Sequence, residues 1–288
     1  MKSFTLETAD GLVLSGSVFE AENASAVVQI VHAFKGHKER YYRLAEFLLS
    51  KGYTTVITDL RGHGESVNAK YFAGHVGSAQ ELLNDQVLVT GYINENYPGK
   101  DVYLLGDSQG SMIARLYLKD HDKLIKKAVL TGAWAPSRLS RIRRSYCAFS
   151  ASLHKDITAN GHLAARANRP SENYLFTNYT AVSEYVNDPL VQNCMLTNGT
   201  IYAAADASFL ATQAPIHTCE NPDLRILIAC GALDKCGAPK QMQRTVNYLK
   251  RDGYRHVFSV SYPEMKHCVL EEMYAEEVYE DIAAFLSD

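Results

Sequence analysis

Short, nearly continuous apolar runs recur along the chain and alternate with longer amphipathic stretches. Strands buried on both faces of a parallel sheet have this pattern, so each run predicts one such strand. Ahead of these runs, residues 3–8 and 12–18 alternate apolar and polar positions around Asp10 and Gly11, which predicts an opening β-hairpin exposed on one face. The buried runs are residues 26–31, 53–58, 102–105, 128–130, 226–229 and 257–260.

The stretches between the runs have apolar residues at helical spacing. In residues 40–51, Leu44 and Leu48 lie on one stripe, and Gly52 follows as a residue typical of helix ends. Strand and helix therefore alternate, which predicts an α/β fold with a mostly parallel central sheet flanked by helices. Further helices are predicted at residues 79–93, 111–119, 240–251 and 271–286.

One segment breaks this alternation. From residue 134 to residue 221 no strand–helix unit repeats, and prolines and glycines separate short helical pieces. An insertion of this length predicts a helical cap (lid) over residues 134–221, while residues 1–133 and 222–288 form the core. We expect its aromatic residues to form an aromatic interior: Tyr146, Phe149, Tyr174, Phe176, Tyr179, Tyr185 and Tyr202.

Composition narrows the class of protein. A formal net charge of −3 gives no reason to expect a nucleic-acid partner. The first residues do not read as a signal peptide, and no run approaches the ~18 apolar residues of a membrane span. We therefore expect a cytoplasmic protein without stable membrane insertion. The six cysteines are scattered without zinc-site spacing, so we expect free thiols, no metal and no cofactor.

The candidate chemistry centres on residues 104–111, Leu-Leu-Gly-Asp-Ser-Gln-Gly-Ser. This is a G-x-S-x-G motif directly after a predicted buried strand and directly before a predicted helix. In that context the serine sits on a sharp, strained turn whose flanking positions must be small. The motif alone is weak evidence for a nucleophilic serine, but its position between a strand and a helix indicates that Ser108 is a nucleophile.

A serine hydroxyl needs a positioned base, and in this kind of fold the chain order is serine, acid, histidine. Asp234 follows a predicted buried strand, and His267 follows the last predicted strand, so both should lie near Ser108. Asp223 and Asp206 are alternative acids, but neither ends a core strand. The other histidines precede Asp234 or, like His256, lead into a strand from the opposite edge of the sheet.

The tetrahedral intermediate of acyl transfer needs hydrogen-bond donors for its oxyanion. We expect one donor to be the backbone N–H of Gln109, the residue after the nucleophile, and the other to be that of Phe34, in loop 32–36. We also expect four side chains to contact substrate: Phe34, Asp107, Trp134 and Cys268.

Two charged segments have competing interpretations. Residues 59–66, Asp-Leu-Arg-Gly-His-Gly-Glu-Ser, follow a core strand, and we expect their charges to hold neighbouring loops together and not to form a second site. The arginines between Arg138 and Arg144 could bind an anionic substrate group. A solvated helix face is the favoured interpretation of this cluster.

Several of these motifs together resemble the monoacylglycerol lipase and lysophospholipase group of α/β-hydrolases, which is classed with the serine aminopeptidase-like (S33) hydrolases. They are residues 31–34, 51–53 and 59–66, the serine motif, the Asp234/His267 pair and residues 185–191. The resemblance covers nearly the whole chain and is weak across most of the lid. The family usually has glycine where Ala33 stands and histidine where Asp107 stands.

This resemblance implies a serine hydrolase that cleaves carboxylic esters, namely monoacylglycerols, lysophospholipids or other small acyl esters, through an acyl-enzyme. No cofactor and no nucleic-acid partner are implied, and the oligomeric state stays open. Three alternatives use the same scaffold: a thioesterase or acyltransferase, an amide hydrolase, and a ligand-binding protein without turnover.

Overall fold

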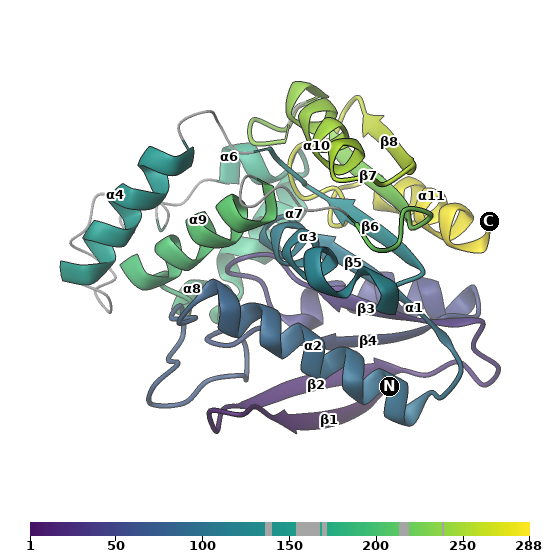
Figure 1. Cartoon of the computed structure of the whole chain (residues 1–288), viewed down its shortest axis with the longest axis horizontal. Helices are drawn as coiled ribbons and strands as arrows, with labels where there is room; N and C mark the ends of the chain where they lie inside the picture. The colour runs from purple at the N-terminus through teal and green to yellow at the C-terminus, as the bar shows by residue number, and fades with distance from the viewer. Residues whose placement is uncertain (136–139, 154–167, 169–171, 213–218, 238) are drawn as a thin grey trace.

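The computed structural model describes residues 1–135, 140–153, 168, 172–212, 219–237 and 239–288, and the expected arginine Arg138 lies outside them. Within this part of the chain, eight strands form one sheet (Figure 1). The strands are β1 (Lys2–Glu7), β2 (Val13–Phe19), β3 (Ala26–Val31), β4 (Thr54–Thr58), β5 (Asp101–Asp107), β6 (Lys127–Thr131), β7 (Arg225–Gly231) and β8 (His256–Tyr262).

The sheet has the order β1-β2-β4-β3-β5-β6-β7-β8. The hairpin β1–β2 is antiparallel, β2 also runs antiparallel to β4, and the remaining pairs are parallel. The predicted mostly parallel sheet is thereby confirmed. The prediction of two buried faces is wrong for β8, which is largely exposed because it is the edge strand of the sheet.

Helices cover both faces of the sheet (Figure 1). One face packs against α2 (Ala79–Asn96), α3 (Gln109–His121) and α10 (Pro239–Arg251). The other face packs against α1 (Tyr42–Ser50) and α11 (Ala275–Ser287). The start of α2 follows from its sequence, because Ser78 and Glu81 form a capping box. Two short 3-10 helices, η1 (Lys38–Tyr41) and η2 (Asp122–Leu124), lie in the connections.

Where the structure describes it, the segment between β6 and β7 contains helices and no strand. Helices α4 and α9 pack against each other beside the sheet (Figure 1). Asp188 caps the short helix α8 by accepting from the N–H groups of Leu190 and Val191. The helices are α4 (Ser140–Leu153), α6 (Glu172–Leu175), α7 (Tyr179–Asn187), α8 (Pro189–Asn193) and α9 (Asn198–Thr212).

The expected aromatic interior of this segment is only partly present. Tyr174 and Tyr185 line the cavity described below, and Phe176 is buried. In contrast, the exposed aromatic residues are Tyr146, Phe149 and Tyr179. Periodicity could not separate these two groups, because the packing partners of each short helix come from distant parts of the chain.

Candidate active site

Ser108 lies on the turn between β5 and α3 with φ at 52°, a backbone conformation that side chains other than glycine rarely adopt. Glycines make this turn possible. A Cβ atom on Gly106 would lie 2.4 Å from the carbonyl oxygen of Gly110, and one on Gly110 would lie 2.1 Å from that of Val31. The close approach of α3 to β3 and β5 therefore requires both glycines of the motif.

The structure brings together the three residues that the sequence singled out. The Ser108 Oγ and His267 Nε2 atoms lie 2.7 Å apart, and His267 Nδ1 lies 2.8 Å from Asp234 Oδ2. The alternative acids lie elsewhere, because Asp206 pairs with Arg144 and Asp223 pairs with Arg255. All three residues follow the carboxyl ends of parallel strands, namely β5, β7 and β8, and so lie at the edge where open α/β sheets bind ligands.

The electrostatics around the hydrogen-bonded residues Ser108, His267 and Asp234 favour a basic imidazole. Burial lowers the pKa of His267, but the hydrogen bond and charge of Asp234 outweigh it and raise the pKa above its ordinary value of 6.5. Burial conversely raises the pKa of Asp234, yet His267 and the N–H groups of Cys236 and Gly237 bring the net pKa below its ordinary value. Asp234 is therefore an ionised, buried acceptor that orients His267.

Two backbone N–H groups beside Ser108 are available to a ligand. Neither the N–H of Phe34 nor that of Gln109 has a hydrogen-bond partner within the described ranges. The loop of Phe34 is closed by a hydrogen bond of 3.1 Å from the Gly36 N–H to the Ala33 carbonyl oxygen. Two such donors near a nucleophile are the arrangement that an oxyanion requires.

Asp107 does not line the cavity over Ser108 that is described below, contrary to the expectation that it binds substrate. It is 1% exposed, and its side chain lies beneath the turn, where it accepts hydrogen bonds from Tyr41 Oη at 2.7 Å and Thr131 Oγ1 at 2.6 Å. The tight turn places Ser108 at the cavity but aims the preceding residue into the protein. Burial raises the pKa of Asp107, and these two donors oppose that effect.

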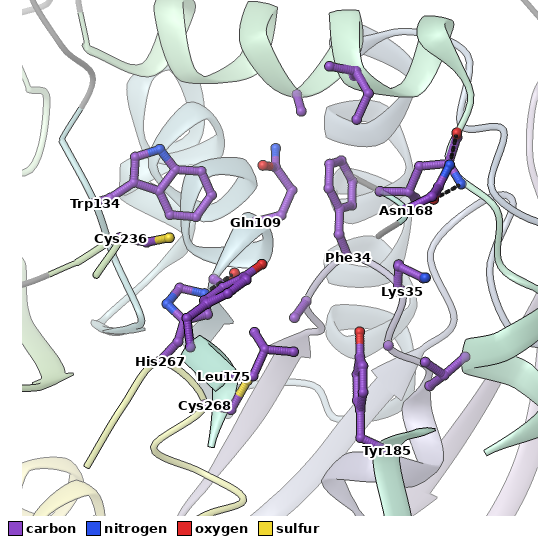
Figure 2. A pocket seen from close by; sticks show the side chains of 18 of the residues that line it. Phe34, Lys35, Gln109, Trp134, Asn168, Leu175, Tyr185, Cys236, His267 and Cys268 are labelled. Atoms are coloured by element: carbon purple, nitrogen blue, oxygen red, sulfur yellow. Dashed lines mark hydrogen bonds between the residues drawn. The ribbon is translucent and has the colours of Figure 1, made fainter. Parts of the chain in front are cut away.

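A cavity of about 750 Å³ opens over Ser108 and His267. The expected contacts Phe34, Trp134 and Cys268 all line it, together with Gln109 (Figure 2). Helices α4, α7, α8 and α9 supply further parts of its wall. The cavity is therefore shared between the sheet edge and the segment inserted after β6.

Charged residues that the sequence analysis missed also line the cavity. They are Lys35, Arg40 and Glu271. Arg40 pairs with both Glu271 and Asp188, and its guanidinium lies 5.0 Å from the centre of the Tyr185 ring. Burial raises the pKa of Glu271 to about 7, even beside Arg40. No periodic pattern marks these residues, because they come from three separate loops and helices.

The arginines of α4 have different roles. Arg143 lines the cavity, whereas Arg144 pairs with Asp206 and lies 5.0 Å from the centre of the Phe209 ring. The expected solvated face therefore describes only part of the cluster, because one arginine turns towards the cavity and another packs against α9.

Residues 59–66 form a structural network, as the sequence analysis favoured. Asp59 accepts hydrogen bonds from Lys38 and from the backbone N–H of Glu65. Arg61 forms a buried two-point pair with Asp85, with N–O distances of 2.7 and 2.6 Å. These contacts hold residues 59–66 beside loop 32–36, because Lys38 lies two residues after that loop.

One group of potential metal ligands occurs among the described residues. Asp234, Cys236 and His267 have ligand atoms within 4.8 Å of one another. His267 Nδ1 and Asp234 Oδ2 already bond to each other, which suits proton transfer at Ser108 better than coordination of an ion. The six cysteines are free thiols.

The sheet order, the strained serine turn and the helices inserted before β7 define an α/β-hydrolase fold. The profile of the family described as serine aminopeptidase, S33 (Hydrolase_4), matches residues 22–273, which is most of the chain. The protein belongs to this family.

Curated relatives align over part of their length. Phospholipase YtpA of Bacillus subtilis is 32% identical over 102 residues, which is 35% of this chain and 37% of the relative. A monoglyceride lipase homolog of monkeypox virus is 34% identical over 105 residues, which is 36% of this chain and 37% of the relative. The aligned stretch thus spans little more than a third of each relative.

Solved structures match over nearly the whole chain. A lipase in an open form has a TM-score of 0.86 at 20% identity, covering 99% of this chain and 98% of that one. A monoglyceride lipase of Saccharomyces cerevisiae has a TM-score of 0.78 at 16% identity, covering 99% and 94%. At these identities the matches show the fold. Within the described residues, no helix is long and apolar enough to cross a membrane.

Proposed function

We propose that the protein is a carboxylic ester hydrolase in which Ser108, His267 and Asp234 form the catalytic triad. The observation that carries this proposal is the continuous hydrogen-bonded relay from the Ser108 hydroxyl to Asp234 at the floor of a cavity. Membership of the S33 family and the names of the relatives, a phospholipase and a monoglyceride lipase homolog, support an acyl ester as substrate.

The reaction begins when Ser108 Oγ attacks the ester carbonyl carbon and His267 Nε2 takes the hydroxyl proton. The N–H groups of Phe34 and Gln109 hold the oxyanion. As the carbonyl carbon loses the alcohol, His267 gives the proton to the departing oxygen, and the acyl group remains as an ester on Ser108. Water then attacks this acyl-enzyme while His267 accepts its proton, and the acid leaves as the serine hydroxyl is restored.

The segment between β6 and β7 acts as a cap in this proposal. Residues of α4, α7, α8 and α9 enclose the cavity opposite the sheet edge. Such a cover excludes water from the oxyanion site and presents apolar side chains such as Val191 and Ile201 to an acyl chain. We infer that monoacylglycerols, lysophospholipids or other small acyl esters bind beneath it.

The test is hydrolysis of p-nitrophenyl esters, from acetate to long-chain acyl groups, by the wild type and by Ser108→Ala. We expect turnover by the wild type and a fall of at least about 10³-fold in the variant, because the nucleophile is lost. Ser50→Ala, the same substitution at the exposed end of α1, should keep wild-type rates. A stoichiometric acyl adduct in the mass spectrum of the wild type alone would identify the intermediate.

Two outcomes contradict the proposal. An equally active Ser108→Ala variant would remove this serine from the mechanism. A wild type that neither cleaves any ester nor reacts with a phosphonate probe would indicate a ligand-binding protein. Product analysis in the presence of a competing alcohol, and assays with matched amides and thioesters, would separate ester hydrolysis from acyl transfer, amidase and thioesterase activity.

A further inference from the structure

The charges on the cavity wall are predominantly positive. Among the described residues that line it, the fixed charges are the cations Lys35, Arg40 and Arg143 and the acid Glu271. Arg40 and Glu271 pair with each other, and a second acid, Asp188, also contacts Arg40. Lys35 and Arg143 have no carboxylate partner in the part of the chain that the structure describes. The cavity is therefore cationic although the whole chain has a formal net charge of −3.

We propose that Lys35 binds an anionic group of the ester substrate, phosphate or carboxylate, so that the enzyme prefers negatively charged esters over neutral ones. This inference rests on the proposed function and narrows the substrate class of the same site. In Figure 2, Lys35 lies on one side of the cavity with Asn168 and Tyr185, and His267 and Trp134 lie on the other.

Lys35 is a cation without a counter-ion in the described part of the chain. Its ammonium group forms no ion pair there, and the residue is half-buried at the cavity. Burial lowers the pKa of Lys35, because a charged ammonium group loses solvation without gaining a carboxylate partner. An anion bound in the cavity would supply the missing partner.

The backbone holds Lys35 in an unusual conformation. Its φ of 58° lies in the left-handed region, and among the described non-glycine residues only Ser108 shares a positive φ. Strained positions of this kind cluster where a side chain must be presented to a ligand. Lys35 lies in the loop that also contains Phe34, so the ammonium group and the proposed oxyanion donor belong to the same turn.

The other two cations on the described wall, Arg40 and Arg143, do not replace Lys35 as the proposed site for an anion. Arg40 already has two acids as partners, and its side chain is 8% exposed. Arg143 is exposed on α4 and lines the cavity from the inserted segment, where it strengthens the positive field. Burial also raises the pKa of Glu271 to about 7, which reduces the negative charge of this wall residue near neutral pH. Each effect favours an anionic substrate.

The experiment compares matched neutral and anionic esters on the full-length protein. One pair is hexanoylglycerol and hexanoylglycerol phosphate, which differ in the alcohol. The other pair is p-nitrophenyl pentanoate and mono-p-nitrophenyl glutarate, which differ by a carboxylate at the end of the acyl chain. The readout is the ratio of kcat/KM for the anionic ester to kcat/KM for its neutral partner, measured at low and at high salt.

The variants isolate the charge. Lys35→Asn removes the ammonium group with a residue that tolerates a left-handed backbone, and Lys35→Arg keeps a cation. Lys100→Asn changes the net charge equally at an exposed loop far from the cavity wall. General damage to the oxyanion loop would slow both esters of a pair and leave their ratio unchanged, so the ratio reports the charge alone.

In one of the two pairs, we expect the wild type to prefer the anionic ester over its neutral partner. The pair that shows this preference tells whether the bound anion belongs to the alcohol or to the acyl group. Lys35→Asn should lower that ratio about tenfold or more, since charged hydrogen bonds contribute this much. Lys35→Arg and Lys100→Asn should keep it, and salt should weaken it. Turnover of neutral esters with no anionic preference, or with a preference unchanged in Lys35→Asn, would overturn this inference and leave the proposed function standing. Failure on all esters would instead contradict the proposed function.

Discussion

The phenol of Tyr41 links loop 32–36 to Asp107, the residue before Ser108, by donating a hydrogen bond to Asp107 Oδ2 at 2.7 Å. The same oxygen of Tyr41 accepts a hydrogen bond from the backbone N–H of Ala33 at 2.9 Å. Thr131 donates to the other carboxylate oxygen of Asp107. A single buried carboxylate thus joins β6, the serine turn and the loop that presents Phe34.

Tyr41→Phe tests this link. The variant leaves the Ala33 N–H and one oxygen of Asp107 without a partner, so the Phe34 N–H should lose its fixed direction towards the oxyanion. We expect kcat to fall about tenfold with KM nearly unchanged, and the free energy of unfolding to fall by about 1–3 kcal/mol. Steady-state ester hydrolysis and urea denaturation measure the two effects.

Tyr42→Phe is the matched control. It removes a neighbouring phenol that bonds to Ser17 Oγ at 2.6 Å, away from the oxyanion loop. This control should keep the wild-type kcat. Equal losses of kcat in both variants would show that the Tyr41 hydroxyl has no special role in positioning the loop.

Burial lowers the pKa of His267, and the hydrogen bond and charge of Asp234 raise it. The charge of Asp107 has a smaller effect and also raises this pKa. Asp107→Asn should therefore move the acid limb of the pH–kcat/KM profile to lower pH. Asp101→Asn changes an exposed carboxylate at the other end of β5 and should leave the limb in place. If the acid limb stays at the same pH in Asp107→Asn, the charge of Asp107 does not affect the pKa of His267.

Asp234 raises the pKa of His267, and only the neutral imidazole can act as a base. In the wild type, kcat/KM should therefore rise with pH through a midpoint above 6.5, the ordinary pKa of histidine. Asp234→Asn should shift this midpoint to lower pH, because burial then acts unopposed by that charge, and should lower kcat by about 10⁴-fold. A pH–rate profile of each protein on one activated ester makes the comparison, and an unshifted midpoint would contradict the assignment of Asp234.

The Asp234–His267 pair should also make stability depend on pH. The folded-state pKa of Asp234 is lowered, so its contribution is present above its ordinary pKa of 3.8 and is lost as pH falls through the lowered value. The folded-state pKa of His267 is raised, so its contribution is present below 6.5 and is lost as pH rises through the raised value. Urea denaturation across pH should show that Asp234→Asn loses the dependence due to Asp234 and shifts that due to His267 to lower pH. Unchanged curves would contradict this coupling.

Arg61 and Asp85 form a pair in which each side chain is 2% exposed. Asp85→Asn leaves a buried guanidinium with a weaker partner, so the free energy of unfolding should fall by about 3–5 kcal/mol. Asp223→Asn breaks an exposed pair with Arg255 and should cost about 0–1 kcal/mol. Urea denaturation distinguishes them. The catalytic rate of folded Asp85→Asn should stay close to wild type, and a selective loss of kcat would give this network a role in the site.

The order of the buried runs and the G-x-S-x-G motif predicted the sheet, the turn at Ser108 and the places of Asp234 and His267. These features are local, because the apolar run of a strand, the glycines of a tight turn and the position after a strand end can all be read from neighbouring residues. The edge exposure of β8 was not predictable, because burial of a strand depends on which neighbours the sheet provides.

The sequence by itself determined the α/β architecture and the identity of the residues at the carboxyl edge of the sheet. Only the tertiary structure decided that Asp107 points away from the cavity, that Tyr41 joins it to loop 32–36, and that Lys35 lines the cavity with no counter-ion among the described residues. These relationships join residues far apart in the chain. Their geometry follows from packing, and a linear pattern of polar and apolar positions does not specify which distant side chains meet.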